Sequence, residues 1–376
     1  MPLQWLSQLE LEFVCGVPCS RLGKLINWAA HATQTVAAVN EGDAVAVCAG
    51  LALAGRNAAY YCQNSGLGNA VSPLTSLVQT FGIPTLGFVS VRGYPDGPAD
   101  EPQHKLMGQI TISLLESMGL EWSYWPRDAR EQADTVARVR RARAERRSYV
   151  VVVVDQSLNA SYPSAHTLAA ARSRTQGAES ITPIESITRK QVLQTIVQHA
   201  SAANAAVVSS TGYVSRALAY TADRDNHFYM VGSMGCAISI ALGVAVGRPQ
   251  RRVVAVDGDG ALLMRMGAAA AAAAQGAGNL THVLLDNGVH ESTGGQPTGA
   301  SAVDFPAWAR AVGYGSVQTV HHSHELDAVI TSAVSCPTTS FVYVRTLQES
   351  AAAAARPSMH PRDVAARFRA HLSAER

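Results

Sequence analysis

The sequence predicts an α/β protein with two doubly wound domains, each built on a parallel β-sheet. Short runs of β-branched and aromatic residues alternate with helical segments, which is typical of such sheets. The alternation stops at 156–183, a stretch rich in Ser, Ala, Thr and Arg that we interpret as a linker, and then resumes. The chain of 376 residues is also too long for one ordinary domain and suits two.

The predicted strands fall into two groups, one on each side of that stretch. The first group is 12–15, 36–40, 58–62, 85–89 and 150–154. The second group is 206–209, 227–231, 252–256, 282–285 and 340–344. We therefore expect a first domain at 1–160, a linker at 161–184 and a second domain with a helical tail at 185–376.

Composition excludes several classes of function. Lys and Arg total 30 against 28 Asp and Glu, so no long basic stripe is available for nucleic acid, and we expect a small-molecule partner. The six cysteines form no CxxC pair, and most lie in apolar runs that favour reduced, buried thiols. The sequence begins without a signal-peptide pattern, and no apolar run reaches the roughly 18 residues that cross a bilayer. We expect a cytoplasmic protein that does not enter the membrane.

A glycine- and aspartate-rich segment follows the predicted strand at 252–256. We expect Asp257, Gly258, Asp259 and Gly260 to form a tight turn, with a helix beginning near Ala261. Glycines let the backbone approach a ligand, a helix N-terminus offers N–H groups to phosphate, and Asp259 offers a hard oxygen to Mg²⁺. Alone the turn is weak evidence, because most such turns are ordinary strand-to-helix connections.

A second element makes a metal and diphosphate site a stronger interpretation. Asn287 closes the next predicted strand of the same domain. The carboxyl ends of adjacent parallel strands share one edge of a sheet, so Asp259 and Asn287 should meet there. An octahedral Mg²⁺ would take oxygens from both side chains and from a backbone carbonyl near Val289, together with two phosphate oxygens and a water.

These residues resemble the signature of thiamine diphosphate enzymes, in which a GDG turn is followed one βα unit later by a pair of Asn. Here the first member of the pair is Asp286, but the family's metal ligand is the second, Asn287. The resemblance implies that the Gly232 carbonyl accepts from the aminopyrimidine and that Met234 wedges between the cofactor rings, although Met234 by itself could be core filler. Further cofactor contacts are implied for Thr211, Gly212, Gly258, Gly260 and Ala261.

Glu41 opens an apolar helical run in the first half and resembles the activating glutamate of that family. Thiamine chemistry needs one carboxyl group on the pyrimidine N1′, in a dry pocket that raises its pKa. The alternative is a first-turn glutamate favoured by the helix dipole. In the family this glutamate and the diphosphate site come from different chains, which implies a homodimer or larger assembly with active sites between chains.

Several further stretches resemble the phosphonopyruvate decarboxylase family, with sulfopyruvate decarboxylases as close relatives. These are 40–50, 61–77, 100–104 and 284–298, and the resemblance covers nearly the whole chain without the middle domain of longer relatives. Ser20 stands where yeast-type pyruvate decarboxylases carry an acidic residue, which removes repulsion toward a substrate with an extra negative group.

A small anionic 2-oxo acid is the substrate that this resemblance implies. Candidate contacts are Arg92, His104, Lys105, His290 and the amides at 292–295, including Thr293. For Arg92 and Lys105 a solvated surface position is the alternative. His104 with Ser20 would handle protons and substrate orientation, and His290 is a further catalytic candidate. His321, His322 and His324 precede a surface helix and are expected to be solvated.

The expected reaction is decarboxylation of 3-phosphonopyruvate to phosphonoacetaldehyde with thiamine diphosphate and Mg²⁺, in a phosphonate biosynthetic pathway. Sulfopyruvate decarboxylation needs the same machinery and a different anion pocket. An acetolactate-type carboligase and a non-catalytic thiamine-binding paralogue are more distant alternatives. Intact Glu41, Asp259 and Asn287 argue against the paralogue.

Overall fold

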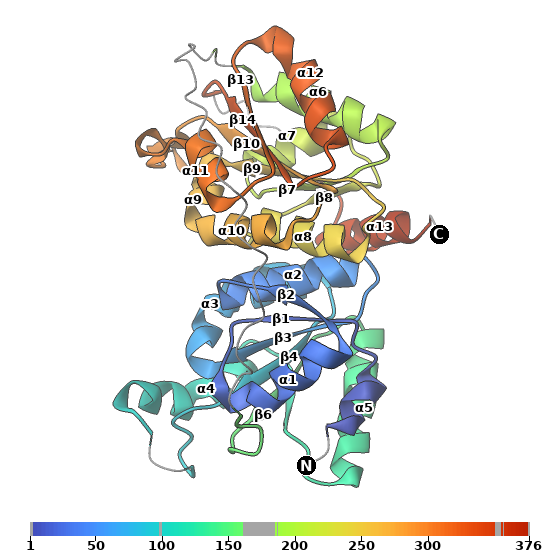
Figure 1. Cartoon of the computed structure of the whole chain (residues 1–376), viewed down its shortest axis with the longest axis vertical. Helices are drawn as coiled ribbons and strands as arrows, with labels where there is room; N and C mark the ends of the chain where they lie inside the picture. The colour runs from blue at the N-terminus through green and yellow to red at the C-terminus, as the bar shows by residue number, and fades with distance from the viewer. Residues whose placement is uncertain are drawn as a thin grey trace. The chain divides into compact units, whose positions relative to one another are not determined.

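The structure is a computed structural model that describes residues 3–97, 100–160, 185, 187–349, 355 and 357–374. The chain divides into two compact units, Met1–Tyr162 and Pro163–Arg376 (Figure 1). Each unit contains a six-stranded sheet whose paired strands all run parallel. The predicted α/β class with two parallel sheets is confirmed. The predicted linker at 161–184 lies outside the described residues, so the exact domain boundaries stay predictions.

The sheet of the first unit has the strand order β2-β1-β3-β4-β6-β5. Its strands are β1 (Phe13–Gly16), β2 (Gln34–Ala37), β3 (Ala58–Gln63), β4 (Leu86–Ser90), β5 (Glu121–Tyr124) and β6 (Tyr149–Val153). Its helices are α1 (Gly23–Ala32), α2 (Glu41–Leu53), α3 (Leu67–Ser72), α4 (Lys105–Ser117) and α5 (Ala129–Ala144), with short turns η1 (Gln4–Leu9), η2 (Ser20–Leu22), η3 (Asn64–Gly66), η4 (Pro73–Gln79) and η5 (Pro102–His104).

Both faces of this sheet are covered, which explains why its inner strands β1, β3, β4 and β6 are buried along almost their whole length. On one face, η1, α1 and α5 enclose a core that includes Trp5, Leu25 and Val136. On the other, α2 packs against β1 and β3. Period-two alternation assigns the side chains, so Val14 belongs to the first core while Cys15 points away from it.

The sheet of the second unit has the strand order β13-β14-β10-β9-β7-β8. Its strands are β7 (Ala206–Ser209), β8 (His227–Tyr229), β9 (Val253–Gly258), β10 (Leu280–Asp286), β13 (Ser316–Val320) and β14 (Ser340–Arg345), with a separate hairpin of β11 (Val289–His290) and β12 (Gln296–Pro297). Its helices are α6 (Arg189–Ala202), α7 (Tyr213–Thr221), α8 (Ala237–Gly247), α9 (Asp259–Met264), α10 (Met266–Gln275), α11 (Phe305–Val312), α12 (Leu326–Ser335) and α13 (Pro361–Ser373), with turns η6 (Glu291–Thr293), η7 (Ala300–Ala302) and η8 (Ser323–Glu325).

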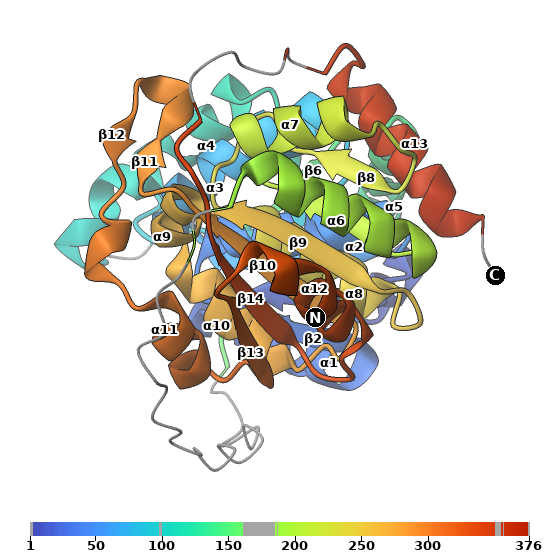
Figure 2. The ribbon, with the colours of Figure 1, turned by 90° about the horizontal axis from the view of Figure 1, so that it is seen from above.

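Helices again cover both faces of this second sheet. Figure 1 shows α8, α10 and α11 on one face and α6 and α12 on the other. Leu284 of β10 and Phe341 of β14 pack with Phe305 and Ala309 of α11 in one core. Figure 2 shows α9, β11 and β12 gathered at one end of the sheet, where α9 contacts β9, β10 and β11. This end is the carboxyl edge of β9 and β10.

The structure differs from the sequence prediction at two edge strands. The strands β5 and β13 were not expected, because each lies at the edge of its sheet and is largely half-exposed, without the apolar signal of a buried strand. The segment 156–160, which begins the Ser-, Ala-, Thr- and Arg-rich stretch, lies in the first unit, as the expected domain bound at 160 has it. Leu158 is buried in the first core, and its carbonyl accepts from the Lys24 backbone N–H at 2.9 Å.

The prediction of a tight turn at 257–260 is wrong. The strand β9 continues through Gly258, and α9 begins at Asp259 with no intervening loop. Neither Gly258 nor Gly260 has a positive φ. Because Asp257 is fully buried among the parallel strands, ladder pairing extends the strand past the point where glycine suggested a turn.

The described thiols and helices agree with the expectations from composition. All six cysteines are free, and Cys336 alone among them is not fully buried. No helix within the described ranges is both long enough and apolar enough to cross a bilayer.

A buried histidine on β8 should make the protein acid-sensitive. Burial lowers the pKa of His227 to about 4, although its Nδ1 lies 3.1 Å from the Ala222 carbonyl. Between about pH 6.5 and 4 the His227 imidazole therefore binds a proton in the unfolded chain but not in the folded chain. The free energy of unfolding falls as the pH drops through this range. Between pH 7 and 5 the unfolding free energy of the parent should fall by about 2 kcal/mol more than that of His227→Gln. Urea denaturation at the two pH values would measure both. Equal losses would contradict this.

Candidate active site

A pocket at the carboxyl edge of the second sheet gathers most of the predicted cofactor residues. Strands β9 and β10 are neighbours, with Gly258 paired to Leu285, so the residues that follow both strands emerge side by side. We call this pocket the cradle. Its lining includes Ser210, Thr211, Gly212, Met234, Gly258, Asp259, Gly260, Ala261, Asn287, Val289, His290, Glu291 and Ser292. Gly232 and Thr293 are not among the described residues that line it.

The two glycines of the aspartate-rich segment serve different purposes. A Cβ at Gly258 would meet only Val214, at 3.9 Å, so the space in front of it is open to a ligand. A Cβ at Gly260 would lie 2.5 Å from Cε1 of His290, so that space is filled by the protein's own imidazole. Gly258 is therefore the position where a diphosphate can approach the backbone, and Gly260 lets His290 pack against α9.

Asp259 is the buried acid of the cradle. Burial raises the pKa of its carboxyl group, and the nearby Asp286 acts in the same direction, while the hydrogen bond from Thr298 to Oδ2 opposes both. A divalent cation beside Asp259 would favour its charged form. Asn287 is half-buried, and its Oδ1 accepts from the Val289 backbone N–H at 3.1 Å.

Asp286, which replaces the first Asn of the family pair, has a structural role here. Its Oδ2 accepts from the Tyr343 hydroxyl at 2.6 Å, and its Oδ1 accepts from the Gly288 N–H at 3.0 Å. Asp286 is buried and does not line the cradle among the described residues. The departure from the family pattern therefore leaves the predicted metal ligands unchanged.

A half-buried ion cluster fixes the segment that crosses the cradle, and sequence reasoning missed it. Arg189, at the start of α6, donates to Glu291 at 2.6 Å and to Glu349 at 2.8 Å. The Glu349 N–H also donates to Glu291, and Gln348 donates to the Asn287 carbonyl at 3.3 Å. Both Arg189 and Glu291 line the cradle. The partners are about 100 or more residues apart in sequence, so no local pattern reveals the cluster.

Glu41 lies in the first unit, as the first residue of α2. The Asn40 side chain caps this helix by accepting from the Gly42 N–H at 2.8 Å. The Glu41 carboxylate is half-buried, accepts from Asn69 at 2.9 Å, and fills the space where a Cβ at Gly66 would stand. Its place at the helix start agrees with both interpretations, so its activating role stays a prediction.

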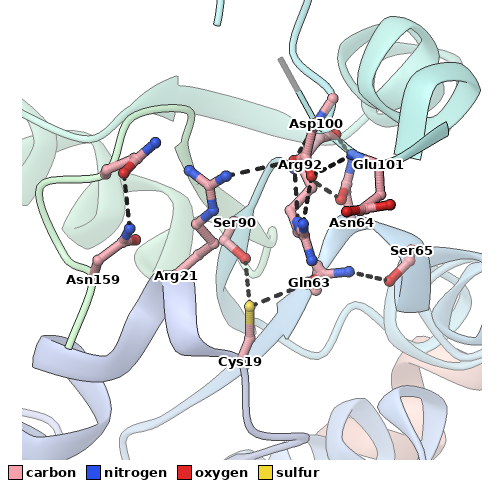
Figure 3. Close-up of polar contacts among 12 residues, drawn as sticks. Cys19, Arg21, Gln63, Asn64, Ser65, Ser90, Arg92, Asp100, Glu101 and Asn159 are labelled. Carbon is pink, nitrogen blue, oxygen red and sulfur yellow. Dashed lines mark hydrogen bonds and ion pairs between the residues drawn. The ribbon is translucent and has the colours of Figure 1, made fainter. Parts of the chain in front are cut away.

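Arg92, one of the substrate candidates of the first unit, binds the carboxylate of Asp100 (Figure 3). Arg92 donates to Asp100 through Nε at 3.1 Å and also through Nη2, and Arg21 approaches the same carboxylate at 3.5 Å. The Arg92 hydrogen bonds hold the pKa of Asp100 well below its usual range. The charge of Arg92 is thus already compensated, which makes it a weaker candidate for binding substrate. Sequence reasoning missed Arg21 and the role of Asp100.

His104 and Ser20 also lie at this carboxyl edge of the first sheet. His104 is 6% exposed, and its Nδ1 has no hydrogen-bond partner in the described part of the chain. Ser20 is exposed and begins η2, next to Cys19, whose thiol lies 3.3 Å from both Gln63 and Ser90. The exposed Lys105 begins α4. Of the three histidines expected to be solvated, His324 is exposed, whereas His321 and His322 are half-buried and the Nδ1 atom of His321 is buried.

The sequence matches one family of known proteins and several individual relatives. Residues 206–344 match the family described as thiamine pyrophosphate enzyme, C-terminal TPP binding domain. A phosphonopyruvate decarboxylase from Streptomyces viridochromogenes is 41% identical over 98% of this chain and 93% of its own, and one from Streptomyces hygroscopicus is 42% identical over 98% and 92%. A sulfopyruvate decarboxylase from Methanosarcina acetivorans is 28% identical over 100% and 97%.

Solved structures agree at the level of the fold. Benzoylformate decarboxylase from Polynucleobacter necessarius superimposes with a TM-score of 0.70 at 15% identity, covering 92% of this chain and 98% of that one. Taken together, the family match and the curated relatives show that the chain is a thiamine pyrophosphate enzyme. Within that class, the chain belongs to the phosphonopyruvate decarboxylase family.

The two glycines of the cradle allow a matched test. We expect Gly258→Ala to leave the stability of the cofactor-free protein within about 0.5 kcal/mol, because the added methyl group meets open space, while thiamine diphosphate binds more weakly. We expect Gly260→Ala to displace the His290 ring even without cofactor. Thermal unfolding would measure the stability of each variant, and calorimetric titration would measure its affinity for thiamine diphosphate. Unchanged cofactor affinity in Gly258→Ala would show that this glycine does not face the diphosphate.

Proposed function

We propose that this chain decarboxylates 3-phosphonopyruvate to phosphonoacetaldehyde and CO₂, with thiamine diphosphate and Mg²⁺. The observation that carries the proposal is the identity of 41–42% to two phosphonopyruvate decarboxylases over 98% of the chain. A setting in phosphonate biosynthesis and a cytoplasmic location are part of the same proposal.

The donor set of the cradle fits a diphosphate and a hard divalent cation. Asp259 and Asn287 would supply side-chain oxygens to Mg²⁺, and Val289 would supply a backbone carbonyl. Gly258 and Ala261, with Thr211 and Gly212, would contact the diphosphate, and Gly260 would do so only through its backbone N–H, because His290 fills the space beside its Cα. No cluster of three or more His, Cys, Asp and Glu occurs among the described residues, so this mixed set is the candidate metal site. The bound cofactor supplies an electron sink for the carbon that loses CO₂.

The chain's own residues would hold the cofactor and move protons. Gly232 would accept from the aminopyrimidine, and Met234 would enforce the bent cofactor. Glu41 of a second copy would hold a proton on the pyrimidine N1′, which requires a homodimer or larger assembly. His104 would donate a proton to the product carbon, with Ser20 orienting the substrate.

His290, Arg92 and Thr293 complete the proposed substrate contacts. The His290 ring packs against Gly260 at the cradle and would act near the reacting carbon. Arg92 would act only through the donors that Asp100 leaves free.

Sulfopyruvate decarboxylation is the second candidate. The relative from Methanosarcina acetivorans spans the whole chain, but at 28% identity rather than 41–42%. A direct comparison would separate the two reactions: purified protein with Mg²⁺ and thiamine diphosphate is offered phosphonopyruvate, sulfopyruvate and pyruvate in an aldehyde-release assay. We expect the highest kcat/KM with phosphonopyruvate. A higher value with sulfopyruvate would move the assignment to that acid, and a ligated product in place of an aldehyde would favour carboligation.

The proposed role of Glu41 predicts a separation of binding from turnover. We expect Glu41→Gln to bind thiamine diphosphate nearly normally, because the amide keeps its size, and to lose on the order of 10²- to 10⁴-fold in kcat. Steady-state kinetics and calorimetric titration would measure the two quantities. Glu12→Gln, which changes a carboxyl group directly before β1, serves as the control and should keep full turnover. Near-normal activity in Glu41→Gln would reject the mechanism but not the fold.

A further inference from the structure

A second cavity adjoins the cradle within the second unit. Its volume of about 360 Å³ falls within the range of small-molecule sites. It shares Thr211 and Gly212 with the cradle, so the two spaces meet at the segment between β7 and α7. The remaining described lining is Ser215, Arg216, Tyr229, Met230, Val231, Pro357, Met359, Pro361 and Val364.

The cavity carries one uncompensated charge. Arg216 is the only charged side chain in its described lining, which contains no carboxylate. Arg216 is half-buried and forms no side-chain hydrogen bond or ion pair with any residue that the structure describes. A guanidinium presents five donors to an anion, and no described residue offers a side-chain acceptor to those of Arg216. The cavity is therefore suited to an anionic group.

A comparison with Arg189 shows that a neighbouring arginine in a similar position does have acidic partners. Both guanidinium groups lie over the ring of Tyr213, with their Cζ atoms 5.5 Å (Arg189) and 5.3 Å (Arg216) from its centroid. Arg189 lines the cradle and is neutralised by two carboxylates, Glu291 and Glu349. Arg216 stands over the same ring, lines the neighbouring cavity and has no such partner among the described residues.

The chemistry of the reaction indicates which anionic group belongs there. Phosphonopyruvate has a carboxylate, which leaves as CO₂, and a phosphonate, which is unchanged from substrate to product. A cation bound to the carboxylate would stabilise the ground state more than the transition state, whereas a cation bound to the phosphonate holds the substrate throughout. The apolar walls from Met230, Met359 and Val364 would strengthen such a pair by excluding water.

We propose that Arg216 anchors the phosphonate group in this cavity and so determines the preference of the enzyme for a dianionic 2-oxo acid. This inference rests on the proposed decarboxylation and adds the residue that selects the substrate. Arg216 lies on α7, four residues after the glycine that both pockets share. The rigid fork of arginine suits the three oxygens of a phosphonate better than a lysine ammonium would.

The test compares two substrates across three variants. We expect Arg216→Met to lower kcat/KM for phosphonopyruvate roughly 10- to 100-fold, mainly through KM, while kcat/KM for pyruvate changes little. Arg216→Lys should fall between the parent and Arg216→Met. Arg362→Met, which removes an exposed arginine next to Pro361 of the cavity wall, is the control and should keep the preference. An equal loss on both acids in Arg216→Met, or an unchanged preference, would overturn the proposal.

A binding measurement separates this inference from the proposed reaction. Phosphonoacetate has the phosphonate group but no keto carbon, so calorimetric titration of the cofactor-loaded protein reports the anion site without turnover. We expect weaker binding in Arg216→Met than in Arg362→Met. If the parent released no aldehyde from phosphonopyruvate, the proposed function would fail, and Arg216-dependent binding would still support the anion site. Binding that does not depend on Arg216 would reject the site even in an active enzyme.

Discussion

The parallel pairing of β9 with β10 is the constraint on which the candidate site depends. Because Gly258 is opposite Leu285, the residues that follow each strand emerge at one edge, and Asp259 and Asn287 line one pocket. Covering helices on both faces hold the pair in register, since a slip by one residue would turn buried side chains toward the opposite face. A site assembled this way needs no long loop to position its oxygens, only adjacent strands of matching length.

Sequence reasoning predicted the parts of the structure that leave a local signal. Buried strands such as β7 read as apolar runs, and most cradle residues lie at or just after the ends of three of them, β7, β9 and β10. Edge strands such as β13 leave a weaker signal, because only part of each side chain is buried. The direct passage from β9 into α9 was also missed, since ladder hydrogen bonds outweighed the turn preference of glycine.

The remaining features depend on contacts between distant segments. Asp100 forms ion pairs with Arg21 of η2 and with Arg92, which follows β4. Arg189 forms ion pairs with both Glu291 and Glu349. Charged residues are expected on the surface when only the sequence is known, and only the folded chain determines which of them are paired and partly buried. The same limit applies to Arg216, whose significance comes from the carboxylates that are absent around it among the described residues.

The Arg189 cluster also couples parts of the chain that would otherwise behave independently. One guanidinium joins the start of α6, the hairpin segment that crosses the cradle and the segment that follows the last strand of the sheet. Any ligand that orders the hairpin must therefore also restrict the other two, by thermodynamic linkage. Cofactor occupancy in such an arrangement is a property of the whole second unit, so its local opening and its ligand affinity vary together.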